Sequence, residues 1–96
     1  MWGAYSQLGS YLAGRARAGE RDVTLLFGDV EVIIGHPLPR RARRHAAWWR
    51  NTTLGVRGGY RVEGYHWYGW VSVGWEAAPD VPGGTVTFRY RRAGPS

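Results

Sequence analysis

The chain has 96 residues, enough for one domain with a single small core; we expect one domain over 1–96, with an ordered core at 4–90 and a frayed tail at 91–96. It contains no cysteine, which excludes disulfides, thiolate metal sites and cysteine nucleophiles. The first twenty residues hold no apolar run of signal-peptide length, and no run reaches the roughly 18 residues of a membrane span. We therefore expect a cytoplasmic protein without a membrane partner.

Positive charge is concentrated in the middle third of the chain. All thirteen basic residues are arginine, and against seven acids they give a net charge of +6. Residues 32–62 hold seven arginines and no acid, whereas residues 1–31 sum to −1 and residues 63–96 to zero. Such a stretch attracts polyanions, while a functionless solvated surface usually mixes both signs. Exclusive use of arginine with abundant glycine and alanine is also typical of a GC-rich bacterial genome.

The first third of the chain predicts a helix followed by a short strand. Leu8, Leu12 and Arg15 recur at helical spacing, which predicts an amphipathic helix over residues 4–17. The β-branched and apolar run that follows predicts a strand over residues 22–27.

A second, shorter helix is predicted over residues 27–34. Val30 and Ile34 stand one turn apart, and Gly35 occupies the position of a glycine that ends a helix. The valine-rich and isoleucine-rich composition is a poor intrinsic helix former, so this helix needs tertiary packing.

A third helix is predicted over residues 39–51, with Pro39 at its first position, where the missing N–H needs no partner. On a helical wheel the packing face consists of Leu38, Ala42, His45, Ala46 and Trp49. The opposite face carries Arg40, Arg43, Arg44, Ala47, Arg50 and Asn51, with Arg41 and Trp48 on one flank. One face of this helix is thus expected to pack and the other to be cationic.

Between this helix and the C-terminal region, residues 51–64 predict a flexible loop that carries Arg57 and Arg61. Residues 65–73 are dense in tyrosine and tryptophan, and their periodicity fits a helix or a strand equally. A chain this short needs large apolar groups for any core, so core packing is favoured over a stacking surface for the aromatic cluster at 60–75.

The C-terminal region predicts a β-hairpin. Residues 75–79 and 85–90 flank a turn at 80–84 that contains two glycines, and the second arm alternates apolar with polar residues. The chain thus predicts an α+β domain of winged helix-turn-helix type: helix, short strand, helix-turn-helix, loop, helix and C-terminal β-hairpin.

Residues suited to catalysis are sparse. His36, His45 and His66 are scattered without metal-ligand spacing, and Asp29 and Glu31 fit solvated helix acids better than a general acid–base pair. No nucleophile elbow, phosphate loop or dinucleotide fingerprint follows a predicted strand. We therefore predict no enzymatic activity, no metal, no cofactor and no small-molecule substrate.

The third helix carries the chemistry that points to a function. A helix of about 13 residues is roughly 20 Å long and fits the major groove of B-DNA. Its positive end favours phosphate, and arginine and asparagine can form bidentate contacts with guanine and adenine. The predicted nucleic-acid contacts are Arg40, Arg41, Arg43, Arg44, Arg50, Asn51, Arg57, Arg61, Arg89 and Arg91, followed by Arg92 in the tail.

Double-stranded DNA is accordingly the expected partner, in transcriptional regulation or in DNA targeting. One alternative is a single-stranded nucleic acid or RNA stacked on the Tyr/Trp cluster. Another is a protein-interaction module for an acidic partner. A homodimer is compatible with paired half-sites, although no residue establishes one.

Four segments carry a family resemblance. Residues 23–35 are VTLLFGDVEVIIG, residues 38–51 are LPRRARRHAAWWRN, residues 69–75 are GWVSVGW and residues 86–89 are VTFR. In this order they resemble the blocks VTLTFEEIEEILG, LPxSARxxxxWWxN, AWLxAGW and VTFxR of a family of small bacterial domains of unknown function. The double-tryptophan block is the specific one, and the resemblance covers about residues 5–90.

The resemblance implies a helix over 65–73 and a DNA-associated module, sometimes joined to nuclease domains, which targets rather than catalyses. Two of the departures from the pattern change the local chemistry. Arg41 replaces the usual serine and adds a charge, and Leu26 stands where a threonine would cap the second helix, a loss of about 1 kcal/mol. The loop over 52–64 is also longer than the family's.

Overall fold

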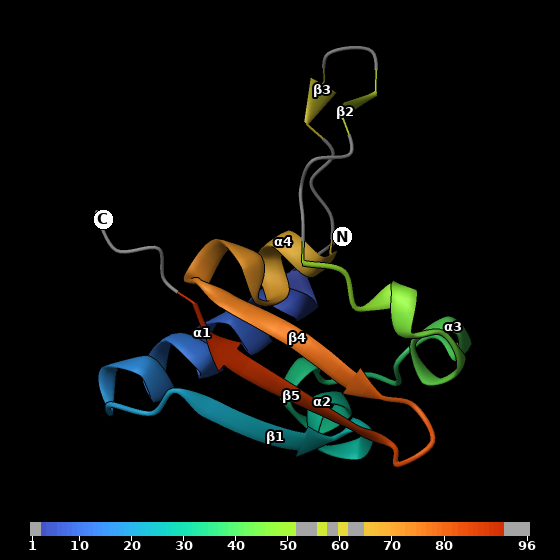
Figure 1. The fold of residues 1–96 in the computed structure, drawn as a ribbon, viewed down its shortest axis with the longest axis horizontal. Coiled ribbons are helices and arrows are strands. Elements are labelled where there is room, and N and C mark those ends of the chain that lie inside the picture. The colour runs from blue at the N-terminus through green and yellow to red at the C-terminus, as the bar shows by residue number, and fades with distance from the viewer. Residues whose placement is uncertain (1–2, 52–55, 58–59, 62–64, 92–96) are drawn as a thin grey trace.

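A computed structural model describes residues 3–51, 56–57, 60–61 and 65–91, with the backbone alone at 56–57, 60–61 and 66–67. The α-helices are α1 (Gly3–Arg17), α2 (Phe27–Ile34), α3 (Arg40–Arg44) and α4 (Tyr65–Gly69), joined by the 3₁₀ turns η1 (Ala46–Trp48) and η2 (Val71–Val73). The strands are β1 (Asp22–Leu26), β2 (Val56–Arg57), β3 (Tyr60–Arg61), β4 (Trp75–Asp80) and β5 (Thr85–Tyr90). Figure 1 shows helices gathered against one side of a small sheet, so the α+β class is confirmed.

The sheet is antiparallel, in the order β1-β5-β4. Val23, Ala77 and Phe88 share one face and are buried against the helices, because side chains alternate across a strand. On the open face, the hydroxyls of Thr24 and Thr87 lie 2.9 Å apart across the two strands. In β5 the buried Val86 and Phe88 alternate with Thr85, Thr87 and Arg89, as the second hairpin arm predicts.

Helix α1 packs closely against α4. Leu8 and Leu12 are fully buried on its inner face, one turn apart. A Cβ atom at Gly9 would lie 2.5 Å from the backbone oxygen of Tyr68, so only a glycine permits this approach of the two backbones.

Helix α2 begins and ends as the sequence predicts. Leu26 precedes it in extended conformation without a side-chain cap, and the carboxylate of Asp29 accepts the Leu26 N–H at 3.0 Å. Gly35 ends the helix at φ 82°, in the left-handed region that favours glycine. Asp29 thus makes one capping hydrogen bond at a helix start where the Leu26 side chain can make none.

The prediction of one helix over residues 39–51 is wrong. Pro39 precedes α3, which ends at Arg44, and His45 is extended at φ −126° and ψ 116° before η1 begins. Consecutive residues of a continuous helix point about 100° apart, and the helical wheel places Trp49 on the packing face and Trp48 on its flank. In the broken segment both rings are buried.

The expected packing face is correspondingly correct in part. Leu38, Ala42 and Trp49 are buried as predicted, and the indole N–H of Trp49 donates to the carbonyl of Ala42 at 2.8 Å. His45 and Ala46 are exposed, because they lie at and beyond the break. The flank residue Trp48 is in the core, where its ring stacks on Tyr65 with centroids 4.1 Å apart.

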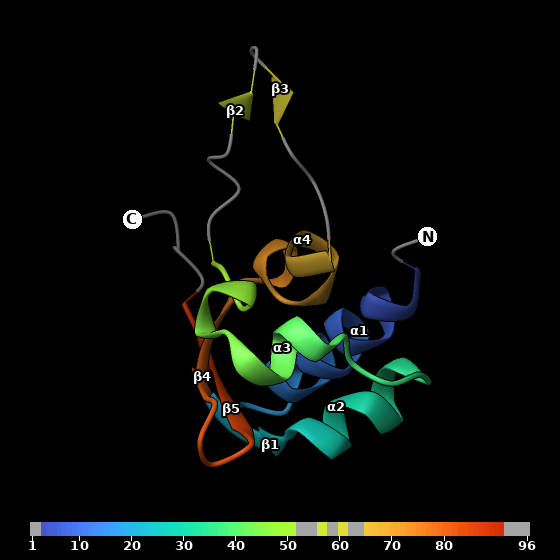
Figure 2. The same cartoon turned by 90° about the vertical axis from the view of Figure 1, so that its right-hand side faces the viewer.

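The segment at 51–64 includes short paired strands, so its prediction as a loop is corrected there. Strands β2 and β3 pair antiparallel, with Arg57 opposite Tyr60 and Val56 opposite Arg61. Figures 1 and 2 both show these strands standing away from α4. Residues 52–55, 58–59 and 62–64 lie outside the described part of the chain.

The helix expected over 65–73 is interrupted in the structure. Helix α4 ends at Gly69, Trp70 leaves helical geometry at φ −146° and ψ −36°, and η2 follows. Trp70 is fully buried, with its ring 5.6 Å from that of Trp49 and 5.7 Å from that of Phe88. The helix is thus interrupted at the residue whose ring lies in the core.

The C-terminal hairpin is confirmed. Gly84 has φ 69°, and the carboxylate of Asp80 accepts the N–H of Gly83 at 3.2 Å, which closes the β4–β5 turn. Arg91 follows β5 directly, and its backbone N–H donates to the carbonyl of Gly74 at 2.6 Å. Residues 92–96 lie outside the description.

Across the described residues, no helix is both long and apolar enough to span a membrane.

Candidate nucleic-acid interface

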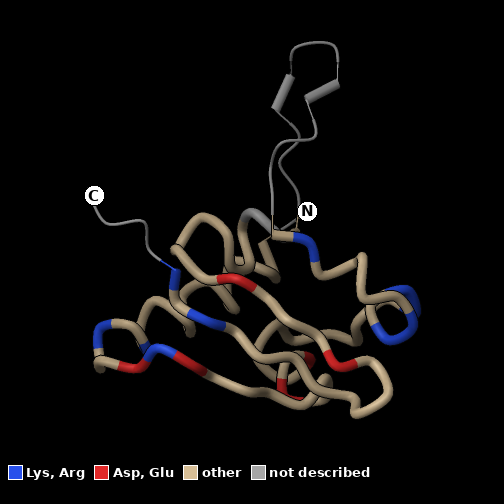
Figure 3. The backbone as a smooth tube through the Cα atoms, in the orientation of Figure 1, with Lys and Arg blue, Asp and Glu red and all other residues tan. Residues whose placement is uncertain are grey.

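A dense group of arginines lies at one end of the domain. Figures 1 and 2 place α3 and the β4–β5 turn at this same end, with α3 on the outside, and Figure 3 shows its basic residues clustered there. The arginines of this segment are all exposed: Arg40, Arg41, Arg43, Arg44 and Arg50. The break in the predicted helix therefore leaves all five arginines exposed.

One acid, Glu31, ties this segment to α2. Its carboxylate accepts the backbone N–H of Leu38 at 2.7 Å and pairs with the guanidinium of Arg43 at 2.6 Å. The hydrogen bond from Arg43 lowers the pKa of Glu31 below its usual value, and that from Leu38 lowers it further. The expectation that Glu31 is simply solvated is wrong. It fixes the turn before α3, and Arg43 is held by this pair.

The hydroxyl of Tyr65 is bonded within the domain. It donates to the carbonyl of Trp48 at 2.7 Å. Burial raises the pKa of Tyr65, while the charges of Arg50 and Arg41 oppose that rise. The bond to Trp48 joins α4 to η1, beyond the break at His45.

The amide of Asn51 is used inside the domain. Its Nδ2 donates to the carbonyl of Ala77 at 2.9 Å, and its Oδ1 accepts the Ala77 N–H at 2.6 Å and the Trp70 indole N–H at 3.1 Å. The side chain thereby pairs with β4 as another strand would. These bonds occupy the groups that a contact with adenine would need.

Arg89 and Arg91 lie apart from α3 and are paired with acids. Both are near the end of β5 that is opposite the β4–β5 turn. The Arg89 guanidinium lies 3.5 Å from the carboxylate of Asp22, and that of Arg91 lies 3.4 Å from Glu76. The structure therefore does not bring these two together with α3.

The remaining predicted contacts, Arg57 and Arg61, are placed by backbone alone. They belong to strands β2 and β3, and their side chains lie outside the description. Arg92 lies outside it entirely.

Aromatic residues form the centre of the core rather than a surface platform. Trp70 and Trp75 are at most 2% exposed, and Tyr65 is half-buried between Trp48 and α1. Of the cluster's described side chains, Tyr68 is the large one that reaches solvent, at 38% exposure. Core packing is thus confirmed for the described part of the cluster.

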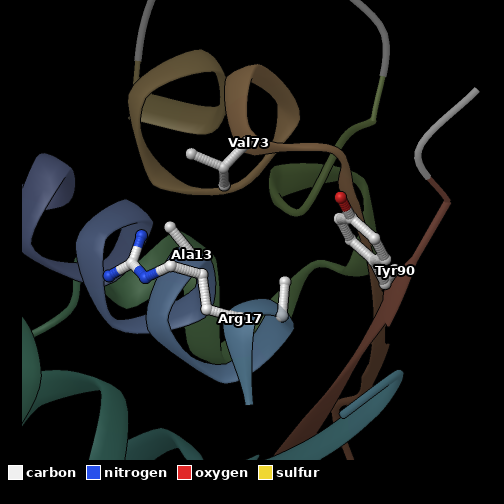
Figure 4. Close-up of a pocket in the computed structure, with 5 residues that line it drawn as sticks. Ala13, Arg17, Val73 and Tyr90 are labelled. Carbon is white, nitrogen blue, oxygen red and sulfur yellow. The ribbon is translucent and has the colours of Figure 1, made fainter. Parts of the chain in front are cut away.

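A shallow cavity of about 390 Å³ lies elsewhere, between the end of α1 and the C-terminal strand (Figure 4). Its lining residues are Ala13, Ala16, Arg17, Val73 and Tyr90. The Arg17 side chain in Figure 4 lies along α1 rather than toward Tyr90, so these residues do not converge on a common point.

Among the described residues, no three or more histidine, aspartate or glutamate side chains lie together in a way that could hold a metal ion.

Sequence reasoning found the arginines but missed that Glu31 pairs with Arg43 and that Tyr65 bonds the backbone of Trp48. The spacing of Glu31 from Leu38 and Arg43 follows no repeating pattern, and Tyr65 was one of several aromatic residues in its segment. Their contacts depend on how α2, α3 and α4 pack, which no local pattern in the chain encodes.

The fold and the site together define a small α+β domain with an exposed arginine-rich helix. The family model described as "Domain of unknown function (DUF7662)" matches residues 5–93, and the chain belongs to this family. No curated protein and no solved structure matches the chain.

Proposed function

We propose that this domain binds double-stranded DNA without catalysing a reaction, and that α3 and the segment after it form the contact surface. The observation that carries the proposal is the charge of α3: four of its five residues are arginine, and all four are exposed. Only Arg43 among them is paired with an acid of the described chain. An unbalanced cationic surface of this kind attracts the phosphate backbone.

The arrangement of elements supports a winged helix-turn-helix interpretation. α1, β1, α2 and α3 precede the β4–β5 hairpin, and β5 lies between β1 and β4. In this interpretation α3 is the recognition helix, the β4–β5 turn is the wing beside it, and residues 45–74 are inserted between them.

The length of α3 limits what it can recognise. Five helical residues extend about 7.5 Å, much less than the roughly 20 Å of the helix predicted from sequence. With Asn51 bonded to β4, the groups that remain are guanidinium forks. We therefore propose binding dominated by phosphate contacts, with weak dependence on base sequence.

Salt dependence tests this proposal. Four contacts from Arg40, Arg41, Arg44 and Arg50 predict that log K falls against log salt concentration with a slope of about −3.6. Contacts from Arg57 and Arg61 as well would bring the slope to about −5. Undetectable or salt-insensitive binding of a 20-base-pair duplex refutes the proposal.

Paired variants locate the surface. Replacing Arg40 and Arg44 by alanine should lower duplex affinity and reduce the salt slope by about 2, while the melting temperature stays within a few degrees of wild type. The matched control replaces Arg17 and Arg21, which are exposed at the opposite end of the sheet and carry the same total charge. Equal losses in the two variants would mean that only net charge matters.

A substitution in the β4–β5 turn should raise duplex affinity instead of lowering it. Asp80 is exposed at the β4–β5 turn, on the same end as α3. Asp80→Asn removes a charge that repels phosphate, while its Oδ1 can still accept the Gly83 N–H. Duplex affinity should rise. An unchanged affinity would place the turn outside the interface.

Oligonucleotide binding also tests the other sequence-based hypotheses. A single-strand binder predicts stronger tryptophan quenching by single-stranded than by duplex oligonucleotides, yet the buried Trp70 and Trp75 offer no face for stacking. A module for an acidic protein predicts no duplex binding at physiological salt. Transcriptional regulation, targeting of a joined nuclease domain and homodimerisation are extensions of the DNA-binding proposal.

A further inference from the structure

The sheet β1-β5-β4 has two outer edges, and the edge along β4 is closed. The side chain of Asn51 bonds both backbone groups of Ala77, so Ala77 and its alternate neighbours Trp75 and Pro79 face away from β5. The N–H of Trp75 donates to the carbonyl of Trp70 at 3.0 Å, and Pro79 has no N–H. An incoming strand therefore finds no free N–H at these three positions.

The other edge, along β1, faces outward without a neighbour. At the two ends of this strand, the carbonyl of Arg21 accepts the N–H of Tyr90 at 2.9 Å, and the N–H of Phe27 donates to Gly84 at 2.9 Å. Odd-numbered residues thus bond β5, because the bonding residues of an antiparallel strand alternate. The residues that face away from β5 are Asp22, Thr24 and Leu26. Figures 1 and 2 both show β1 at the outer margin of the sheet.

Two of these three outward residues have free backbone groups. The N–H of Leu26 is bonded to the carboxylate of Asp29, and its carbonyl belongs to α2, because the residue before a helix accepts the first helical hydrogen bond. Among the described residues, the N–H and C=O groups of Asp22 and Thr24 have no hydrogen-bond partner. Native proteins commonly protect such an edge with proline, lysine or a bulge, and β1 has none of these.

Two copies of β1 can satisfy all of these groups. In an antiparallel pair centred on Val23, Asp22 of each copy lies opposite Thr24 of the other, and each facing pair exchanges two hydrogen bonds. The four bonds use every free N–H and C=O of both edges. A pair centred on Thr24 would instead place Asp22 opposite Leu26, whose groups are already bonded at the start of α2. The free groups therefore select one register.

The ends of the paired strands are also complementary in charge. In this register Arg21 of one copy lies opposite Leu25 of the other, beside the first turn of the second copy's α2, which carries Asp29. Arg21 and Asp29 are both exposed, and antiparallel pairing repeats the same approach at the other end. Opposite charges on neighbouring positions favour the pairing.

We propose that β1 is a self-association edge, through which a second copy of this chain pairs antiparallel about Val23 and joins the two three-stranded sheets into one. The interface is small, so we expect a weak dimer with a dissociation constant of about 100 μM. Figure 1 shows α3 at the end of the sheet where β1 finishes, so the two α3 helices would lie at opposite ends of the joined sheet. The pairing itself requires no DNA.

Sedimentation velocity between about 10 μM and 1 mM measures the association, and backbone amide exchange by NMR over the same range locates it. The amides of Asp22 and Thr24 should exchange about threefold more slowly at the highest concentration, whereas those of Val23 and Leu25, which bond β5, should be protected throughout. A protein that stays monomeric at about 1 mM overturns the proposal and leaves the edge for a strand of another protein. A dimer in which Thr24 exchange does not change with concentration also overturns it.

Thr24→Pro and Thr24→Ala form a matched pair. Both lose the hydroxyl that lies 2.9 Å from that of Thr87, but only proline loses the outward N–H, which the monomer does not use. Dimerisation should weaken at least about tenfold in Thr24→Pro and stay within about threefold of wild type in Thr24→Ala. Equal dimerisation of the two variants would overturn the proposal.

Thr24→Glu and Thr24→Lys test the register and keep the N–H, so they decide the matter if Thr24→Pro does not fold. Opposite Asp22 of the second copy, glutamate should weaken the dimer about threefold and lysine should strengthen it about threefold. General repulsion between chains of net charge +6 predicts the reverse, because glutamate lowers this charge and lysine raises it. Association of Thr24→Glu that equals or exceeds that of Thr24→Lys would overturn the register.

Discussion

Replacing Asn51 by alanine distinguishes most directly between the sequence-based and the structural roles of this residue. The wild-type amide joins the segment after η1 to β4 by exchanging two hydrogen bonds with Ala77, and it accepts a third from the indole of Trp70. Alanine removes all three and leaves the Ala77 N–H and C=O without these partners. As a base contact, by contrast, Asn51 would affect affinity and not folding.

The size of the effect follows from these three bonds. At about 1 kcal/mol each they sum to about 3 kcal/mol, but the Trp70 indole N–H retains a second acceptor, the carbonyl of Arg50 at 2.9 Å. Water can also reach part of the site, since Asn51 is exposed on one side. We therefore expect a loss of about 2 kcal/mol in the free energy of unfolding, equivalent to about 8–16 °C in melting temperature.

Urea unfolding followed by tryptophan fluorescence measures this loss, with Arg44→Ala as the exposed control, expected within about 0.5 kcal/mol of wild type. Duplex affinity is measured on the folded Asn51→Ala protein. A change in stability below about 0.5 kcal/mol would refute the structural role. Unchanged stability with lost duplex binding would restore Asn51 as a base contact.

Three further predictions concern stability. Gly9→Ala would place a methyl group 2.5 Å from the backbone oxygen of Tyr68 and should destabilise the protein by about 1–3 kcal/mol in thermal melts. In the same helix, the methyl group of Gly14→Ala would meet only the flexible Arg17 side chain at 3.8 Å, so this variant should stabilise the protein by about 0.5–1 kcal/mol. Leu26→Thr supplies the missing side-chain cap of α2 and should stabilise by about 1 kcal/mol in urea unfolding. The hydrogen bond from Arg43 lowers the pKa of Glu31 below the usual glutamate value of 4.5. The stability that Glu31 adds is therefore fully present above pH 4.5 and is lost as the pH falls through the lowered pKa. Glu31→Gln should flatten this part of the stability–pH curve, measured by unfolding between about pH 3 and 7.

Each of these has a clear contrary result. Equal effects of alanine at Gly9 and Gly14 would mean that α1 and α4 do not approach as closely as the structure has them. A destabilising Leu26→Thr would mean that the exposed leucine contributes more by packing than a cap does. A Glu31→Gln curve parallel to wild type would mean that the carboxylate is not tied to α3 in solution.

Local patterns predicted the elements whose signals are complete within a few residues. Helix α2 has apolar residues one turn apart and a glycine that ends it at positive φ. The β4–β5 hairpin has alternating apolar residues around a turn that Gly84 closes. In both cases the same residues supply the local conformation and the buried face, so propensity and packing agree.

The broken helices were not predictable in this way. Residues 39–51 have the composition and periodicity of a helix, and so does much of 65–73. The breaks lie at His45 and Trp70, and Trp48, Trp49 and Trp70 are buried in one aromatic core. This burial is set by elements distant in sequence, so a reading of each segment alone cannot detect it.

The sequence by itself determined where the positive charge lies and that an arginine-rich helix follows α2, because charge and periodicity are local properties of the chain. Tertiary structure decided which of these side chains face solvent without a partner. Glu31 holds Arg43, Asn51 pairs with β4, and Arg89 and Arg91 pair with acids of the sheet. The physical reason is that hydrogen bonds and ion pairs act over a few ångströms, and only folding brings such partners within that distance.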